Sequence, residues 1–298
     1  MSYILDPHIE ATVDRCRQQP LVLAIQDTTA INYTGLKGTV GLAKIGGGGA
    51  GRCGVLAHAG LAVTGEGRPL GLFTMDTTFR DQIAELDSQC WLHGLTRASE
   101  RAPACPNIRV ISVGDREGDF WELLATAVSI ESALLVRASR SAKQRVLRPD
   151  GEGQDLWDFE TTLPPLAITD LTIPAAGGLR ARKERMARLE RRTAPVAVLP
   201  PQSVSGQNPL SLFAVSATEI AVAETDEPLH WLLLTTERPA PELKIGDLLP
   251  RPIYKNVSRL MRSRAVALPI SPNAQGNILT FRQPQCIPVK ILNSDTLC

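Results

Sequence analysis

The fold is decided by two stretches of sequence, LVLAIQDTT at residues 21–29 and IRVISVGDREGD at residues 108–119. Each begins with a short, mostly apolar run, which is typical of a buried β-strand, and each run stops at an acidic residue. We expect the first strand to end at Asp27 and the second at Asp115. Because ligands collect at the carboxyl ends of strands in α/β sheets, these two aspartates are the first candidates for a functional site.

The elements around these two stretches alternate between helix and strand. Apolar residues at helical spacing predict helices at residues 7–19, 80–100 and through 120–124. Apolar runs bounded by turn residues predict further strands at residues 55–63, 70–73, 131–137 and 229–236. The sequence therefore predicts an α/β sheet.

The sequence changes character twice after the second of these stretches. Between residues 138 and 228, short β-like runs alternate with turns and basic clusters, which predicts a β-rich insertion into the sheet. Residues 243–298 are rich in proline and contain eight basic and two acidic residues, against 24 and 29 before them. We therefore expect four parts: a first core segment, a basic insertion, a returning core strand and an irregular tail, at residues 1–137, 138–228, 229–242 and 243–298.

The composition excludes several classes of protein. The chain has 298 residues, 43% of them hydrophobic, with 32 Lys and Arg against 31 Asp and Glu, which fits a globular protein rather than a disordered or fibrous one. No apolar run approaches the roughly 18 to 20 residues of a membrane span, and the first residues do not resemble a signal peptide, so we expect a cytoplasmic location. The six cysteines are scattered without a C-x-x-C pair, which argues against a zinc ribbon or a disulfide scaffold.

The chemistry of two strand-end carboxylates points to a metal. Asp27 and Asp115 would repel each other at one edge of the sheet unless a divalent cation lay between them. Carboxylate oxygens suit Mg²⁺ or Mn²⁺. Such a site favours phosphoryl transfer, in which two metal ions stabilise the attacking and leaving oxygens.

Three motifs, in this order, resemble the insertion-sequence transposases of the DDE type that include the Tn-five enzyme: LAIQDTT at residues 23–29, VGDREGD at 113–119 and WLLLTTE at 231–237. The resemblance covers about residues 5–240. It implies a ribonuclease-H-like core interrupted by a β-rich insertion, with Asp27 and Asp115 as the first two metal-binding carboxylates. It also implies that Trp231 helps to hold a flipped-out base at the transposon end, where an aromatic ring stacks on any base.

The resemblance further implies that the insertion lies against DNA, and the insertion is basic. Clustered Lys and Arg neutralise phosphates with little sequence specificity. The candidate DNA-binding residues, besides Trp231, are Arg140, Lys143, Arg145, Arg182, Lys183 and Arg185. Taken alone, the cluster at residues 180–192 is equally compatible with a solvated amphipathic helix or loop.

The third carboxylate of the family is not found. It is a Glu on a helix, seven residues after a Tyr, yet seven residues after Tyr254 stands Met261, and no glutamate follows Glu242. We therefore expect Mg²⁺ or Mn²⁺ to bind weakly and most strand cleavage to be lost. One hypothesis is that the reading frame shifted near residue 240, which would make the tail out-of-frame and disordered.

Other interpretations remain open at this stage. The chain begins only one short helix before Asp27, where full-length relatives carry a DNA-end-binding helical region, and the family's C-terminal dimerisation helices are not found. It therefore reads as a truncated remnant, for which self-association stays possible. It can also be a non-catalytic DNA-binding or interfering protein, or carry a diverged DNA-binding tail. A phosphatase with Asp27 as nucleophile is a third alternative, although Thr29 stands where such enzymes have a second aspartate.

Overall fold

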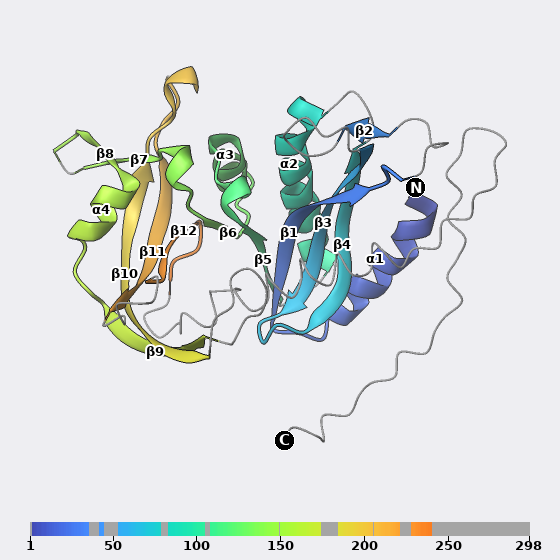
Figure 1. The fold of residues 1–298 in the computed structure, drawn as a ribbon, viewed down its shortest axis with the longest axis horizontal. Helices are drawn as coiled ribbons and strands as arrows, with labels where there is room; N and C mark the ends of the chain where they lie inside the picture. The colour runs from blue at the N-terminus through green and yellow to red at the C-terminus, as the bar shows by residue number, and fades with distance from the viewer. Residues whose placement is uncertain are drawn as a thin grey trace.

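The structure is a computed structural model that describes residues 2–35, 42–44, 53–78, 83–104, 108–148, 150–173, 184–204, 206–220 and 228–239 (Figure 1). Within these residues the chain forms one large mixed sheet with helices, which confirms the predicted α/β class. The tail predicted at residues 243–298 lies outside the described residues. None of the described helices is long and apolar enough to cross a membrane.

The elements follow the predicted alternation. The helices are α1 Ser2–Cys16, α2 Ile83–Arg101, α3 Trp121–Ser129 and α4 Leu156–Thr162, with short 3-10 turns η1 Ala102–Ala104, η2 Arg116–Gly118, η3 Arg140–Ala142 and η4 Gln202–Val204. The strands of the first part are β1 Leu21–Asn32, β2 Ala43–Lys44, β3 Cys53–Thr64, β4 Pro69–Thr78, β5 Arg109–Gly114 and β6 Leu134–Arg137. The remaining strands are β7 Arg145–Leu147, β8 Gly153–Asp155, β9 Ala167–Ile173, β10 Arg185–Val198, β11 Leu210–Ile220 and β12 His230–Thr235.

The sheet has two halves, which are joined by the hydrogen bonds between β6 and β12. In the first half the strand order is β4-β3-β1-β5-β6, with β3 antiparallel to β1 and β4, and β5 and β6 parallel to β1. The second half continues from β6 through β12, β11 and β10, all antiparallel to their neighbours. The expected insertion is therefore β-rich, and its strands extend the core sheet through β12.

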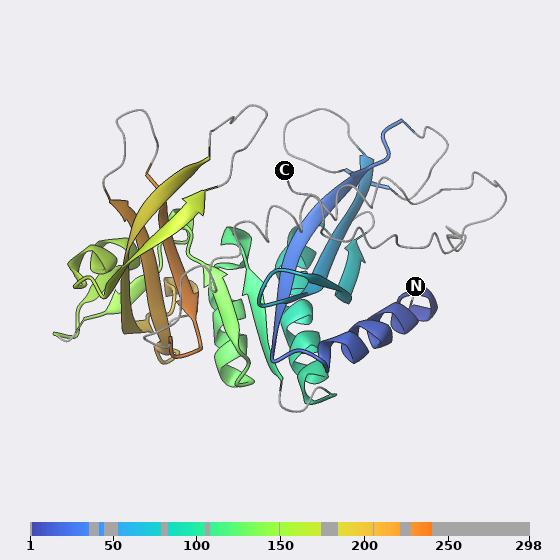
Figure 2. The same ribbon diagram turned by 90° about the horizontal axis from the view of Figure 1, so that it is seen from below.

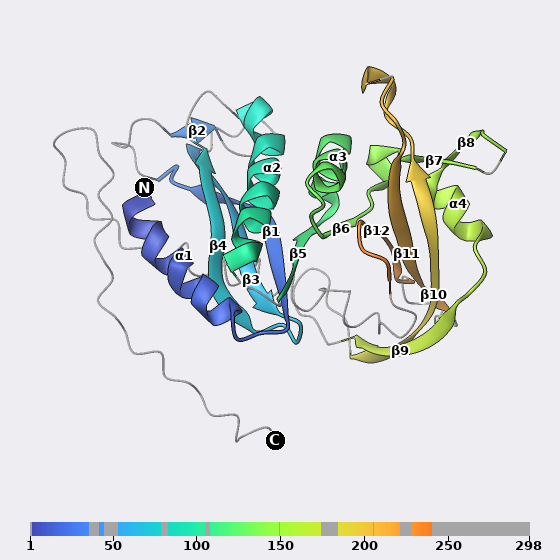
Figure 3. The same cartoon turned by 180° about the vertical axis from the view of Figure 1, so that it is seen from behind.

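The helices pack on one face of the sheet (Figures 2 and 3). Successive side chains of a strand point to opposite faces. Val22 and Ala24 of β1 pack against Cys16 of α1 and Ala98 of α2, whereas Ile25 packs on the other face with its neighbours in the sheet. Further along the sheet, α2, α3 and α4 contribute Trp91, Leu123 and Leu156 to a cluster with Leu232 and Leu234 of β12.

Three elements differ from expectation. The first helix begins at Ser2 rather than at residue 7, so that Pro7 lies inside α1. The first strand runs to Asn32. The basic segment that was compatible with a helix or loop forms β10 from Arg185 onward, because Ala187 and Leu189 alternate into the core while β9 and β11 pair with its two edges.

Candidate functional site

Asp27 lies inside β1, not at its end. The strand continues because residues 22–32 pair with β3, and Asp27 stands opposite Ala59 in that ladder. The parallel pairing with β5 is what ends here, since its last register pair is Ile25 with Val113. The expectation that the strand stops at Asp27 is therefore wrong: the rim beside Asp27 is formed by the end of β5.

Asp115 directly follows β5 and caps η2. Its Oδ1 accepts a hydrogen bond of 2.8 Å from the backbone N–H of Glu117. Asp27 and Asp115 each stand two residues beyond the register pair of Ile25 and Val113, Asp27 still within β1 and Asp115 one residue after the end of β5. Neighbouring strands are about 4.8 Å apart. The two predicted aspartates thus follow the end of the parallel pairing between β1 and β5 by the same number of residues.

Asp27 and Asp115 offer the type of donor that a hard cation prefers, but two side chains are fewer ligands than such a cation needs. Carboxylate oxygens are the ligands that Mg²⁺ and Mn²⁺ prefer. Among the residues that the structure describes, no three His, Cys, Asp or Glu side chains are grouped so that they could hold a metal ion. Residues 240–298, where the third carboxylate was sought, lie outside the described part of the chain.

A buried polar network lies behind Asp27, on the helix-covered face of β1. The ring of His58 from β3 joins the side chains on both sides of Asp27: its Nε2 is 3.0 Å from Gln26 Oε1, and its Nδ1 is 2.9 Å from Thr28 Oγ1. Because an amide oxygen only accepts, Nε2 carries the proton and Nδ1 accepts from the Thr28 hydroxyl. Burial lowers the pKa of His58 from 6.5 to about 4, against the opposing effect of the Asp76 charge, so the ring is neutral at pH 7.

Helix α2 closes this network from outside. The ring of Trp91 meets the His58 ring edge-on with centroids 4.8 Å apart. Gly94 lies against Gln26 so closely that a Cβ atom there would be 2.1 Å from Gln26 Oε1. The strand segment that carries Asp27 is therefore fixed by side chains as well as by its ladder.

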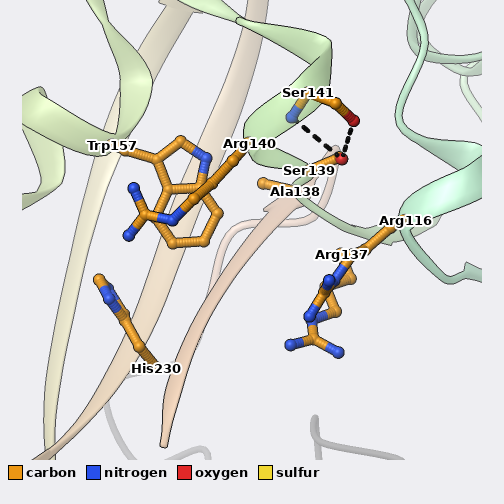
Figure 4. Close-up of a pocket in the computed structure, with 8 residues that line it drawn as sticks. All are labelled: Arg116, Arg137, Ala138, Ser139, Arg140, Ser141, Trp157 and His230. Atoms are coloured by element: carbon orange, nitrogen blue, oxygen red, sulfur yellow. Dashed lines mark hydrogen bonds between the residues drawn. The ribbon is translucent and has the colours of Figure 1, made fainter.

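A positively charged cavity of about 410 Å³ opens beside the end of β6, next to the segment that carries Asp115 (Figure 4). Its polar lining consists of hydrogen-bond donors: three guanidinium groups, two hydroxyls and an imidazole. They belong to Arg116, Arg137, Arg140, Ser139, Ser141 and His230. Ala138 and Trp157 complete the lining, which contains no carboxylate.

One wall of the cavity is formed by the side chains of Arg140, Trp157 and His230, which contact one another. The guanidinium carbon of Arg140 lies 4.1 Å from the ring centroid of Trp157, in the geometry of a cation–π contact. The His230 ring meets the Trp157 ring edge-on, at an interplanar angle of 84° and with the ring centroids 5.1 Å apart. His230 Nε2 is in turn 3.1 Å from Glu160 Oε2. The wall is thus held from α4, η3 and β12 together.

Glu160 is a buried carboxylate that anchors this wall. Its side chain is 1% exposed, accepts a hydrogen bond of 2.6 Å from Ser216 Oγ, and lies 3.7 Å from Arg192 Nη1. Burial alone would raise the pKa of Glu160, but the hydrogen bonds from His230 and Ser216 and the charges of His230 and Arg192 outweigh it and lower the pKa. The carboxylate therefore stays charged and keeps His230 in place.

Asp119 fixes the loop that carries Arg140. It is 5% exposed, and its two carboxylate oxygens accept hydrogen bonds from the backbone N–H of Ser139 at 2.6 Å and from Gln144 Nε2 at 3.1 Å. Burial raises the pKa of Asp119, and these two hydrogen bonds oppose the shift. The last aspartate of the second quoted stretch thus connects the core to the start of the insertion.

The predicted DNA-binding residues are spread over different environments. Arg140 lines the cavity, Lys143 is exposed in the left-handed backbone region with φ of 48°, and Arg145 donates a 2.7 Å hydrogen bond to the carbonyl of Gly153. Arg185 forms an ion pair with the buried carboxylate of Glu219, including a 2.9 Å hydrogen bond. Arg182 and Lys183 lie outside the described residues.

Trp231, expected to stack on a base, is 3% exposed and packs in a core cluster with Leu233 and Val215. The half-buried tryptophan that reaches a cavity is Trp157, which the sequence did not single out. Arg116 could have been found, since it stands inside the second quoted stretch. Trp157 and His230 carry no local signal, because only the pairing of the sheet brings α4 beside β12.

No family model matches this chain, so its function is argued from the site.

Proposed function

We propose that this protein is a DNA-binding protein of the DDE transposase type, whose metal site is catalytically defective. The observation that supports the proposal is that Asp27 and Asp115 each stand two residues beyond the last register pair of the adjacent parallel strands β1 and β5. Carboxylate oxygens suit a divalent cation, and Asp115 can offer its Oδ2 while its Oδ1 caps η2.

The arrangement of the sheet supports the same class. In the order β4-β3-β1-β5-β6, the first three strands along this half are antiparallel and the last two are parallel to β1. This is the arrangement expected of a ribonuclease-H-like core, and the strands of the basic insertion follow directly beside β6 through β12. The strand order of the sheet therefore supports the same class of protein as the sequence resemblance.

The parts of the site have separate roles in this proposal. Asp27 and Asp115 would hold Mg²⁺ or Mn²⁺, which when bound supplies charge stabilisation to a phosphodiester and activates water. His58 forms hydrogen bonds with Gln26 and Thr28, and these bonds hold the β1 segment around Asp27 in position when the cation binds. Arg116 and Arg140 provide positive charge for nucleic-acid phosphates beside the metal-binding edge.

The defect follows from the ligand count. No glutamate occurs in the sequence after Glu242, and the position that the family pattern assigns to the third carboxylate is Met261. Two protein ligands hold a divalent cation less firmly than three, so cleavage suffers more than DNA binding. A purely non-catalytic DNA-binding role is the second candidate, favoured by this same missing ligand.

The full-length chain can be tested with supercoiled plasmid in the presence of Mg²⁺ or Mn²⁺. We expect the plasmid to be retarded on a native gel, with little or no nicking above background. Nicking that disappears in the Asp27→Asn variant would contradict the proposed defect. Absence of any retardation, under conditions where the chain is folded by circular dichroism, would contradict a function on DNA.

A further inference from the structure

The cavity beside β6 is lined by three guanidinium groups, two hydroxyls and an imidazole, and none of its lining residues is a carboxylate. Arg116 and Arg140 contribute guanidinium groups, and neither forms a hydrogen bond or ion pair with a carboxylate of the described residues. Guanidinium groups bind phosphate and carboxylate oxygens through paired N–H groups. The carboxylate of Glu160, which lies close to this wall, is directed at His230 and Ser216 instead.

An unsatisfied donor points to the same kind of ligand. The indole N–H of Trp157 is buried and has no hydrogen-bond partner among the residues that the structure describes. A buried donor without an acceptor is unfavourable, and native structures rarely leave one without a reason. In Figure 4 the nitrogen side of the Trp157 ring is drawn toward the segment of Ser139, which also lines the cavity, so a bound oxygen atom can accept this hydrogen bond once the side chains that cover the nitrogen shift.

The donors are held in place before any ligand arrives. Trp157 is fixed between Arg140 and His230, as its ring contacts show. Ser139 Oγ and Ser141 Oγ are 2.7 Å apart and share one hydrogen, which leaves the second hydroxyl hydrogen to donate. Fixed donors bind an anion with less loss of side-chain entropy than mobile ones.

We propose that this cavity is a phosphate-binding site, separate from the aspartate pair, that takes a phosphate ester of nucleotide size. The volume of about 410 Å³ lies in the range of about 300–1,000 Å³ typical of small-ligand sites and exceeds what a bare phosphate needs. The phosphate is held by Arg116, Arg140 and the Trp157 N–H. The ester comes from one of two sources, a nucleic-acid strand or a free phosphorylated molecule.

The test measures binding of the full-length chain in EDTA, without divalent cations, so that its outcome does not depend on the metal site. The probes are a fluorescent single-stranded oligonucleotide followed by anisotropy, and inorganic phosphate followed by calorimetry. The variants are Arg140→Gln and Trp157→Phe, with Arg188→Gln as the matched control, because Arg188 is exposed on β10 and does not line the cavity. Circular dichroism confirms that each variant is folded.

We expect Arg140→Gln to weaken binding of at least one probe tenfold or more. Trp157→Phe, which keeps the ring but removes the N–H, weakens it several-fold, and Arg188→Gln changes it less than threefold. If the oligonucleotide alone shows this pattern, the ester belongs to a nucleic-acid strand; if inorganic phosphate shows it, the site takes free phosphate compounds. Equal losses of affinity in Arg140→Gln and Arg188→Gln, or no loss of affinity for either probe, would overturn the proposal. The Asp27→Asn variant, measured in the same way, should bind both probes as the unmodified chain does.

Discussion

His58 gives the sharpest quantitative prediction, because its neutral form is built into the fold. The ring is 3% exposed, and a doubly protonated ring cannot accept the hydrogen bond from Thr28. The groups that face it are Gln26, Thr28 and the Trp91 ring, with Asp76 the one nearby charge that favours protonation. Asp76 is itself paired with Arg97 at 2.8 Å, which limits its help.

The size of the effect follows from the pKa values. The pKa of His58 is about 4 in the folded chain, and that of an unfolded histidine is about 6.5. Above about pH 6.5 both states are neutral at this residue, so His58 contributes no pH dependence. As the pH falls from there to about 4, only the unfolded state takes up the proton, and the fold loses about 1.36 kcal/mol per unit, or about 3 kcal/mol in all.

The assay is urea unfolding followed by circular dichroism at several pH values between 7 and 4. The unmodified chain should lose about 3 kcal/mol more than His58→Gln over this range, whatever the difference between the two chains at pH 7. The difference between chains removes the contribution of acidic groups such as Glu160 and Glu219, which also titrate. Parallel loss of stability in the two chains would refute the reasoning.

A second measurement covers the case in which His58→Gln does not fold. In a nuclear magnetic resonance titration of the four histidines of the unmodified chain, the His58 resonance should stay in its neutral position down to about pH 4. A His58 resonance that titrates near pH 6.5 in the folded chain would contradict the account equally well.

Two further predictions concern residues that support the site. Gly94→Ala should destabilise the chain by roughly 1–3 kcal/mol, although alanine normally favours a helix, because its Cβ would meet Gln26; a melting temperature at or above that of the unmodified chain would count against this packing. Asp119→Ala should cost about 1–3 kcal/mol by leaving the Ser139 N–H without an acceptor, whereas Asp119→Asn keeps one acceptor and loses the buried charge, so it should cost less than about 1 kcal/mol. Equal unfolding free energies for the two Asp119 variants would show that this hydrogen bond contributes little.

The sequence predicted the strands whose residues are buried on both faces, because an uninterrupted apolar run leaves little choice. Residues 22–25 are of this kind, and residues 111–113 are buried as well, although Ser112 is polar. It missed the continuation of β1 through Gln26 and Thr28, since these polar residues are accommodated by His58, which lies on another strand. Local sequence carries no sign of such a partner.

The sequence did not predict the cavity, for the same reason. Arg140 belonged to an obvious basic cluster, but Trp157, Glu160 and His230 become neighbours only through the packing of α4 on the sheet. The strand β10 was hidden by its charged residues, although Ala187 and Leu189 alternate correctly, because the partner strands β9 and β11 had to be known first. Tertiary pairing, rather than local preference, determined both features.

The central claim, that Asp27 and Asp115 form one divalent-cation site, is tested most directly by calorimetric titration of the chain with Mn²⁺. The unmodified chain should bind Mn²⁺ weakly at one saturable site, and either Asp27→Asn or Asp115→Asn should remove that binding. The matched control is Asp170→Asn, an exposed carboxylate on β9, which should bind as the unmodified chain does. Mn²⁺ binding that persists unchanged in both Asp27→Asn and Asp115→Asn would contradict the claim.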